Sequence, residues 1–472
     1  MGSKERFYLD IMDVHPEVTG SCHLVVVKLP NGETIKFVVD CGLFQENGCE
    51  EFNRDLPFNS DEIEFCIVTH NHVDHIGRLP LMVRNGFRGN IYTTHSTSKL
   101  LPFALADSFK VLRDVSKRKN RKMLYDELDV FKTEALITAC NYNEAIEVNE
   151  NIKVTLLKNG HLVGAALALV QISYPEFDDI NLLFTGDYNN KNMFFAVPDI
   201  PKWILKLPLT VIQESTYGYM DSNNMVKTFK YNVQDCIKKG GTVIVPVFSL
   251  GRAQEILYEI KCMQDNGELS KDIPIFFDGK LAFKYTDLYL KGVLEIKPEM
   301  RDFLPENLTF VDKAIRPQVL EDTERKIVVT TSGMGSYGPA QTYIPVYIQR
   351  YNALIQFTGY TADGTLGNRL KNAQYGEDLE VGGLVVKKHA RVEYTTEYSA
   401  HAKADEMIEF LKQFENLKLI LVNHGQADVK VKFAKRILDE VDPKAVGILG
   451  RDFFFRINPY GLVKTLSTKF RM

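Results

Sequence analysis

The first half of the chain consists mainly of short apolar runs that are separated by polar turns. Residues 22–41 contain two such runs, joined by Asn31-Gly32, a dipeptide typical of a tight hairpin turn. Residues 65–68, 152–157 and 181–186 are further apolar runs of strand length. This pattern predicts a series of largely buried strands.

After residue 217 the pattern changes to helices that alternate with strands. The predicted helices are residues 226–239 and 254–263, and the predicted strands are residues 242–248, 273–277, 326–331 and 353–358. This order is typical of a parallel sheet covered by helices. Glycine-rich turns at 331–339 and 359–367 can present backbone N–H groups to phosphate, although most such turns are only turns. A helix at 405–414 and a strand at 417–422 then follow, so the middle of the chain is predicted to be an inserted segment.

The loop after the strand at 65–68 is unusually rich in metal-ligand side chains. His70, His72, Asp74 and His75 fall within six consecutive positions, although the whole chain has only 10 histidines. His70 and His72 can point the same way from the strand end, whereas Asp74 and His75 can face a second point. Imidazole nitrogen and carboxylate oxygen are the ligands that borderline divalent metals prefer. The spacing predicts two adjacent metal ions, and the ordinary alternative is a solvated polar loop.

Other predicted strands also lead to side chains of this kind. Asp40, His161 and Asp187 each follow a strand, and strand ends hold ligands more rigidly than free loops do. For Asp40 the sequence leaves two interpretations open, a structural cap or a partner that orients a metal-bound histidine. His401 precedes the helix at 405–414, and His424 follows the last of these strands.

Composition narrows the class of protein. The chain has 472 residues, 45% hydrophobic and 25% charged, which is the balance of a globular protein of about two domains. The net charge of −4 means that a polyanion could be bound only through a local cluster of positive side chains. Residues 110–122 are the basic candidate, although an exposed charged helix end is the ordinary interpretation. The seven scattered cysteines, the lack of a signal sequence and the lack of a membrane-length apolar run lead us to expect a cytoplasmic protein and no membrane partner.

These motifs resemble a known family. Asp40, His70 to His75, Gly160-His161 and Thr185-Gly186-Asp187 are similar to the leading motifs of the metallo-β-lactamase superfamily. The motifs typical of its β-CASP nucleases are at residues 214–218, 246–255, 332–334, 364–367, 399–402 and 424–425. The resemblance is nearest to bacterial and archaeal relatives of the endonuclease subunit of the pre-mRNA cleavage and polyadenylation complex. It implies an α/β fold in which an αββα metallo-β-lactamase sandwich, residues 1–218 and 397–472, carries an inserted β-CASP domain, residues 219–396.

The resemblance also implies the roles of individual residues. It places one metal ion on His70, His72 and His161, the other on Asp74, His75 and His424, and Asp187 between them. The expected cofactors are two Zn²⁺ ions, with Mn²⁺ as the alternative. The expected catalytic residues are Asp74, His401, Glu214 and Asp40. The expected phosphate-binding residues are Ser332, Gly333, Met334 and Arg252.

The function implied is a metal-dependent ribonuclease that acts on single-stranded RNA. Endonucleolytic and 5′-exonucleolytic action both stay open, as does a homodimer. The alternatives are a DNA-processing β-CASP nuclease and a non-catalytic RNA-binding scaffold of the same fold. His424 favours RNA, because DNA repair relatives typically have valine there, and the intact ligand positions argue against a scaffold. The chain departs from the family pattern at Gln426, at Asn368 and in the loop 335–337. These departures affect substrate preference more than metal binding.

Overall fold

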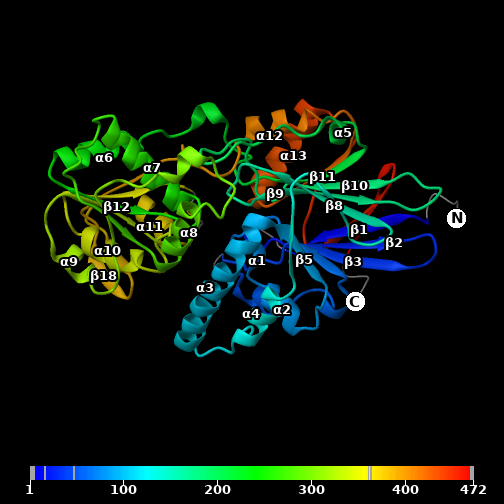
Figure 1. Cartoon of the computed structure of the whole chain (residues 1–472), viewed down its shortest axis with the longest axis horizontal. Helices are drawn as coiled ribbons and strands as arrows, with labels where there is room; N and C mark the ends of the chain where they lie inside the picture. Colours follow the sequence, from blue (N-terminus) through cyan, green and yellow to red (C-terminus); the bar gives the residue numbers. More distant parts are fainter. Residues whose placement is uncertain (1–5, 15–17, 46–47, 360, 362–363, 468–472) are drawn as a thin grey trace. The chain divides into compact units, whose positions relative to one another are not determined.

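The chain forms two compact units. The computed structural model describes residues 6–14, 18–45, 48–359, 361 and 364–467. The first unit comprises Met1–Ser222 and His401–Met472, and the second comprises Asn223–Ala400. Figure 1 shows the C-terminal segment, in orange and red, in the same unit as the N-terminal segment, in blue.

Two sheets form the centre of the first unit. The first sheet has eight strands, in the spatial order β23 (Gly461–Ser467), β22 (Phe453–Asn458), β1 (Tyr8–Asp13), β2 (His23–Lys28), β3 (Thr34–Val39), β4 (Phe65–Ile67), β5 (Asn90–Thr94) and β6 (Ile137–Cys140). The second has seven, in the order β21 (Val446–Ile448), β20 (Leu417–Asn423), β11 (Leu209–Glu214), β10 (Ile180–Phe184), β9 (Ala166–Ile172), β8 (Ile152–Lys158) and β7 (Ala145–Glu147). β20 pairs with β11 and β22 pairs with β1. The segment after the second unit therefore completes both sheets.

Both faces of the central strands are covered, which explains why they contain consecutive apolar residues, such as Leu24 to Val27 in β2. In β2, Val25 and Val27 belong to the core between the two sheets, whereas Leu24 and Val26 belong to the core under the helices of the first sheet. Successive side chains of a strand point to opposite faces, so a strand buried on both sides cannot alternate between apolar and polar positions.

Helices cover the outer face of each sheet. Those of the first sheet are α1 (Val73–Ile76), α2 (Leu79–Arg84), α3 (His95–Lys119) and α4 (Glu127–Glu134). Those of the second sheet are α5 (Lys202–Leu205), α12 (Ala404–Leu411) and α13 (Ala427–Val441). The αββα sandwich that the family resemblance implied is confirmed.

The second unit is built on a parallel sheet. Its six strands lie in the order β14 (Leu308–Phe310), β13 (Ile275–Asp278), β15 (Lys326–Thr330), β12 (Thr242–Pro246), β16 (Ala353–Phe357) and β19 (Arg391–Tyr394). Its helices are α6 (Phe229–Lys238), α7 (Arg252–Asp265), α8 (Lys280–Leu290), α9 (Arg316–Glu321), α10 (Ala340–Tyr347) and α11 (Leu366–Asn372), and β17 (Asp378–Val381) forms a small hairpin with β18 (Leu384–Lys387). The first predicted helix begins later than expected, at Phe229, because the carbonyl of Val226, which in a helix would accept the N–H of Lys230, accepts the N–H of Thr396 at 3.0 Å instead. Of the second glycine-rich turn, Tyr360, Ala362 and Asp363 lie outside the described residues.

Candidate metal centre

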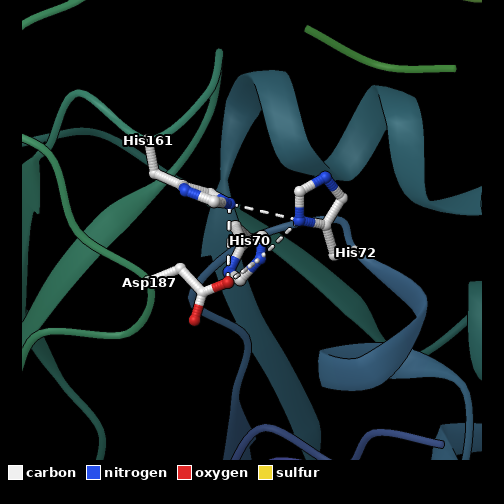
Figure 2. Close-up of side chains that lie close together, drawn as sticks. All are labelled: His70, His72, His161 and Asp187. Carbon is white, nitrogen blue, oxygen red and sulfur yellow. Dashed lines mark hydrogen bonds and ion pairs between the residues drawn. The ribbon is translucent and has the colours of Figure 1, made fainter. Parts of the chain in front are cut away.

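The first group of ligand-type side chains gathers four residues from three loops. His70 and His72 follow β4, His161 follows β8 and Asp187 follows β10, and one ligand atom of each lies within 4.8 Å of all the others. Figure 2 shows the three imidazoles and the carboxylate turned toward one another. Nδ1 of His72 lies 3.2 Å from His70 Nε2 and 3.1 Å from His161 Nε2. Asp187 Oδ2 lies 3.5 Å from Nε2 of both His70 and His161.

The second group lies on the other side of the Asp187 carboxylate. It consists of Asp74 and His75, both on α1, and His424, which follows β20. Nε2 of His75 and Nε2 of His424 are 3.3 Å apart, and each is 3.2 Å from Asp187 Oδ1. Asp74 Oδ2 is 3.8 Å from His424 Nε2. Asp187 thus presents one oxygen to each group, as a bridging carboxylate would.

The donor atoms fit cations. Asp187 Oδ1 is buried and accepts no hydrogen bond from the described residues, although two ring nitrogens face it. A buried carboxylate oxygen without a donor is costly, so an atom of opposite charge is the natural occupant of this point. Facing imidazole nitrogens about 3 Å apart, with carboxylate oxygens beside them, are the donor set of a zinc or manganese site.

Hydroxyls and a carboxylate fix which nitrogen of each imidazole faces the site. The Thr69 hydroxyl donates to Asp40 Oδ2 at 2.8 Å, so it must accept from Nδ1–H of His70, 3.1 Å away. The Thr216 hydroxyl donates to the His424 carbonyl at 3.4 Å and lies 3.1 Å from Nδ1 of the same residue. In both histidines Nε2 is left with its lone pair directed into the site, the tautomer that a metal requires. No role could be assigned to either threonine from the sequence, although Thr216 lies in the motif at residues 214–218, because a hydroxyl beside a ligand looks like any other loop residue.

Asp40 occupies both of the roles that the sequence left open. Its Oδ1 accepts the backbone N–H of Thr69 at 2.8 Å, which caps the ligand loop, and its Oδ2 lies 2.7 Å from His75 Nδ1. Asp40 has φ of 60° and His424 has φ of 46°, a backbone conformation that few non-glycine residues adopt. Both residues are held there by the contacts of their side chains with the site.

Burial and charge divide the histidines into two classes. Burial lowers the pKa of His70 and takes that of His72 to about 4, so both imidazoles are neutral near pH 7. Burial also acts to lower the pKa of His424, but Asp187 and Asp74 outweigh it and raise that pKa to about 9. The carboxylates that stabilise a proton on His424 would stabilise a metal cation in the same place.

A third group joins the same carboxylate. His401, which precedes α12, places Nδ1 at 2.9 and 3.1 Å from the two oxygens of Glu214 and Nε2 at 3.8 Å from Asp187 Oδ2. Glu214 ends β11 and is buried. His72, Asp74 and His401 are the partly exposed members of the three groups, so they mark the side from which a substrate can approach.

Two further residues fasten the loop of Asp74 and His75. Arg78 is fully buried, and its guanidinium donates to the carbonyls of Gly42, Phe52 and Gly20, the last two at 3.1 and 3.4 Å. The backbone next to these glycines holds the ligand loop, since the Ser21 N–H donates to the Asp74 carbonyl at 2.8 Å and the Cys41 N–H donates to the His75 carbonyl at 2.7 Å.

Gly42 is the second of these residues. A Cβ on it would lie 1.5 Å from the Asp74 carbonyl oxygen, so only glycine fits. The sequence did not mark Arg78 as structural, because an arginine at a helix start usually faces solvent.

The predicted phosphate-binding residues all belong to the second unit. Ser332 Oγ binds the backbone of its own loop, and Gly333 lies so close to the backbone N of Phe248 that a Cβ would be 2.9 Å from it. The carbonyl of Met334 accepts the N–H of Gly367 at 2.9 Å. Arg252 is buried, and its guanidinium donates to a backbone carbonyl at 2.8 Å. Their contact with phosphate stays a prediction.

Comparison with known families matches three segments of the chain. Residues 29–193 match a metallo-beta-lactamase superfamily domain, residues 253–370 a Beta-Casp domain, and residues 385–446 a Zn-dependent metallo-hydrolase RNA specificity domain. In the part of the chain that the structure describes, no helix is both long and apolar enough to span a membrane.

Several curated proteins are similar over most of the chain. The RNase J-like protein of Methanocaldococcus jannaschii is 30% identical over 437 residues, which cover 89% of this chain and 94% of that protein. Ribonuclease TTHA0252 of Thermus thermophilus is 27% identical, over 89% of this chain and 93% of its own length. Endoribonuclease ysh1 of Schizosaccharomyces pombe is 27% identical over 87% of this chain, which spans 53% of that longer protein.

Proposed function

The chain belongs to the β-CASP ribonuclease family of the metallo-β-lactamase superfamily, and from this premise we propose that it hydrolyses phosphodiester bonds of single-stranded RNA. The observation that carries the proposal is the position of Asp187, whose two oxygens each face one cluster of histidines. The names of its relatives, a ribonuclease and an endoribonuclease, support RNA as the substrate and internal cleavage as its mode. A 5′-exonucleolytic action on the fragments is compatible with the same site.

We assign two metal ions to the site, zinc first and manganese as the alternative. One would be held by His70, His72 and His161, the other by Asp74, His75 and His424, and both by Asp187. Such a pair supplies Lewis acidity toward the phosphate and lowers the pKa of water enough to provide hydroxide near neutral pH.

Side chains of the protein supply proton transfer and orientation. Glu214 holds Nδ1–H of His401, so that Nε2 faces the side on which substrate approaches. In its cationic form His401 can give the Nε2 proton to the leaving 3′-oxygen, and Glu214 stabilises that cation. Asp40 orients His75 and fixes the ligand loop.

The proposal extends to the compartment. No disulfide is found among the described residues although the chain has seven cysteines, which suits the reducing cytoplasm.

Incubation of the purified protein with end-labelled single-stranded RNA, and with DNA of the same sequence, tests the function. We expect internal RNA fragments with 5′-phosphate and 3′-hydroxyl ends, because the nucleophile is water and not the 2′-hydroxyl, and slower cleavage of DNA. Mononucleotides released from a 5′ label would identify exonucleolytic action. A 2′,3′-cyclic phosphate, or no cleavage in zinc or in manganese, would contradict the proposal.

A further inference from the structure

The C-terminal half of α3 and the turn after it form a strongly basic surface on an otherwise acidic chain. Residues 110–122, which we call the basic arm, contain one acid, Asp114, and seven cations in a chain whose net charge is −4. The cations are Lys110, Arg113, Lys117, Arg118, Lys119, Arg121 and Lys122, and all are exposed.

Only part of this charge is compensated. Lys119 and Arg121 form ion pairs with Glu50 at 2.5 and 2.7 Å, and Arg113 lies 3.9 Å from Asp114. The four other cations have no ion pair with a carboxylate in the described part of the chain; they are Lys110, Lys117, Arg118 and Lys122. The basic arm therefore carries a net positive charge that carboxylates in the described part of the chain do not neutralise.

Packing does not explain the charge on this half of the helix, in which Leu112 is the last hydrophobic side chain that packs, partly buried, against the core. The buried residues of α3 end at Ser108, and the preceding turns pack Leu101 and Leu105 into the core. Positive side chains in the last turn of a helix interact favourably with the helix dipole, which accounts for Lys117 to Lys119. That effect fades within one turn, so it explains neither Lys110 nor Lys122, which follows the helix.

The N-terminal end of α3 is hydrogen-bonded to the loop that carries the proposed ligand His161. The hydroxyls of Thr94 and Thr97 donate to the carbonyl of Gly164 at 2.7 and 2.9 Å, three residues after His161. α3 also contacts α1, which carries Asp74 and His75. Figure 1 shows α3 running from the region of α1 to the edge of the first unit.

Helix geometry gives the distance between the two ends. Lys110 and Lys117 follow Thr97 by 13 and 20 residues, which at a rise of 1.5 Å each is about 20 to 30 Å. At about 3.4 Å per phosphate, the spacing of one strand of a duplex, this length matches roughly six to nine nucleotides.

We propose that the basic arm binds the phosphates of the RNA strand whose scissile bond lies at the metal centre, several nucleotides away. This rests on the proposed function, since an RNA must occupy that site. The repeated charge, with no aromatic residue among residues 110–122 on which a base could stack, suits a backbone contact that is independent of sequence. Cleavage then depends on RNA length and on salt.

The test compares kcat/KM on an RNA of about 20 nucleotides with that on an RNA of about 4 nucleotides, which cannot span the distance. The arm variant carries Lys110→Gln, Lys117→Gln, Arg118→Gln and Lys122→Gln. The control variant loses the same charge at exposed lysines of the first unit, through Lys202→Gln, Lys206→Gln, Lys435→Gln and Lys464→Gln.

On the long RNA we expect the arm variant to lose most of the salt dependence of the wild type. Each phosphate contact with a single strand contributes about 0.7 to the slope of log affinity against log salt concentration. With four such contacts, kcat/KM of the wild type should fall roughly 50-fold more than kcat/KM of the arm variant between about 50 and 200 mM salt. On the short RNA, kcat/KM of the arm variant should agree with that of the wild type within about twofold. The control variant should match the wild type on both RNAs and at both salt concentrations.

An arm variant that behaves like the control variant, or that loses activity equally on both RNAs, would overturn the inference. A wild-type protein that cleaves neither RNA would instead refute the proposed function, so the two failures are distinguishable.

Discussion

Replacing Glu214 by glutamine isolates the part that the carboxylate contributes to His401. Glu214 accepts three donors, the N–H of Tyr188 at 2.6 Å, the N–H of Thr216 at 3.2 Å and Nδ1–H of His401 at 2.9 Å. Glutamine has the same shape but only one acceptor oxygen, so its NH₂ group must face at least one of these donors. Each carboxylate oxygen accepts one of the two backbone N–H groups, so the NH₂ group of glutamine faces a backbone N–H in either orientation. The remaining oxygen can still accept Nδ1–H of His401, but it carries no negative charge to stabilise the imidazolium.

The expected magnitude follows from the burial of the pair. Glu214 is 1% exposed and the His401 side chain 18%, so solvent screens their interaction little. A hydrogen bond to a charged group contributes about 1.5–3 kcal/mol, and at about 1.36 kcal/mol per tenfold this corresponds to a loss in kcat of about 10- to 150-fold. His401→Ala removes the proton donor itself and should cost about 10²–10⁴-fold.

Single-turnover cleavage of labelled RNA and metal analysis by mass spectrometry measure both variants. Neither should lose metal, because neither residue is among the seven proposed ligands. The double variant supplies the control, since Glu214 is proposed to act only through His401. Its rate should therefore equal that of His401→Ala alone.

Independent, additive losses in the double variant would refute the coupling of Glu214 to His401. Near-normal cleavage by His401→Ala would refute its role as proton donor, and loss of metal from it would make it a ligand instead.

Three further substitutions address the metal centre and its support. His72→Ala should lower the metal content from two ions per chain and abolish cleavage together, and a variant with full metal content would contradict the ligand assignment. Gly42→Ala should also lose metal, because its Cβ would displace the Asp74 carbonyl, whereas Gly450→Ala, whose Cβ meets open space, should bind metal normally. Arg78→Met should lower the free energy of unfolding by about 3 kcal/mol in urea denaturation, since buried carbonyls lose their donor, and an unchanged urea midpoint would show that this guanidinium is dispensable.

The strands and the insertion could be predicted because their signals are local, whereas the αββα sandwich was implied only by the resemblance to a family. Apolar runs with a turn dipeptide between them define strands such as β2 and β3 without knowledge of their neighbours. The return of a helix and a strand after residue 400 indicated an insertion, and β20 and β22 do complete the sheets of the first unit. Element ends were less predictable, because a contact with a distant residue decides them, as Thr396 does at the start of α6.

The candidate site was predictable to the extent that its ligand types are crowded along the chain. Four of the seven proposed ligands lie within six positions, and this density alone indicated two points of binding. The pairing of Glu214 with His401 spans 187 residues and came only from the resemblance to a family. No periodicity in the sequence connects two side chains at such a separation.

Apart from Asp40, the residues that orient the ligands were not predicted from the sequence. Thr69 and Thr216 each decide the tautomer of one histidine by a single hydroxyl proton, and Arg78 holds the loops behind α1. Their importance depends on distances of about 3 Å across the fold, which residue type and spacing do not encode. A metal site made of ligands alone would leave each imidazole free to turn or to bind a proton on either nitrogen. The selectivity of this centre for cations over protons therefore depends as much on two threonine hydroxyls and Asp40 as on the ligands themselves.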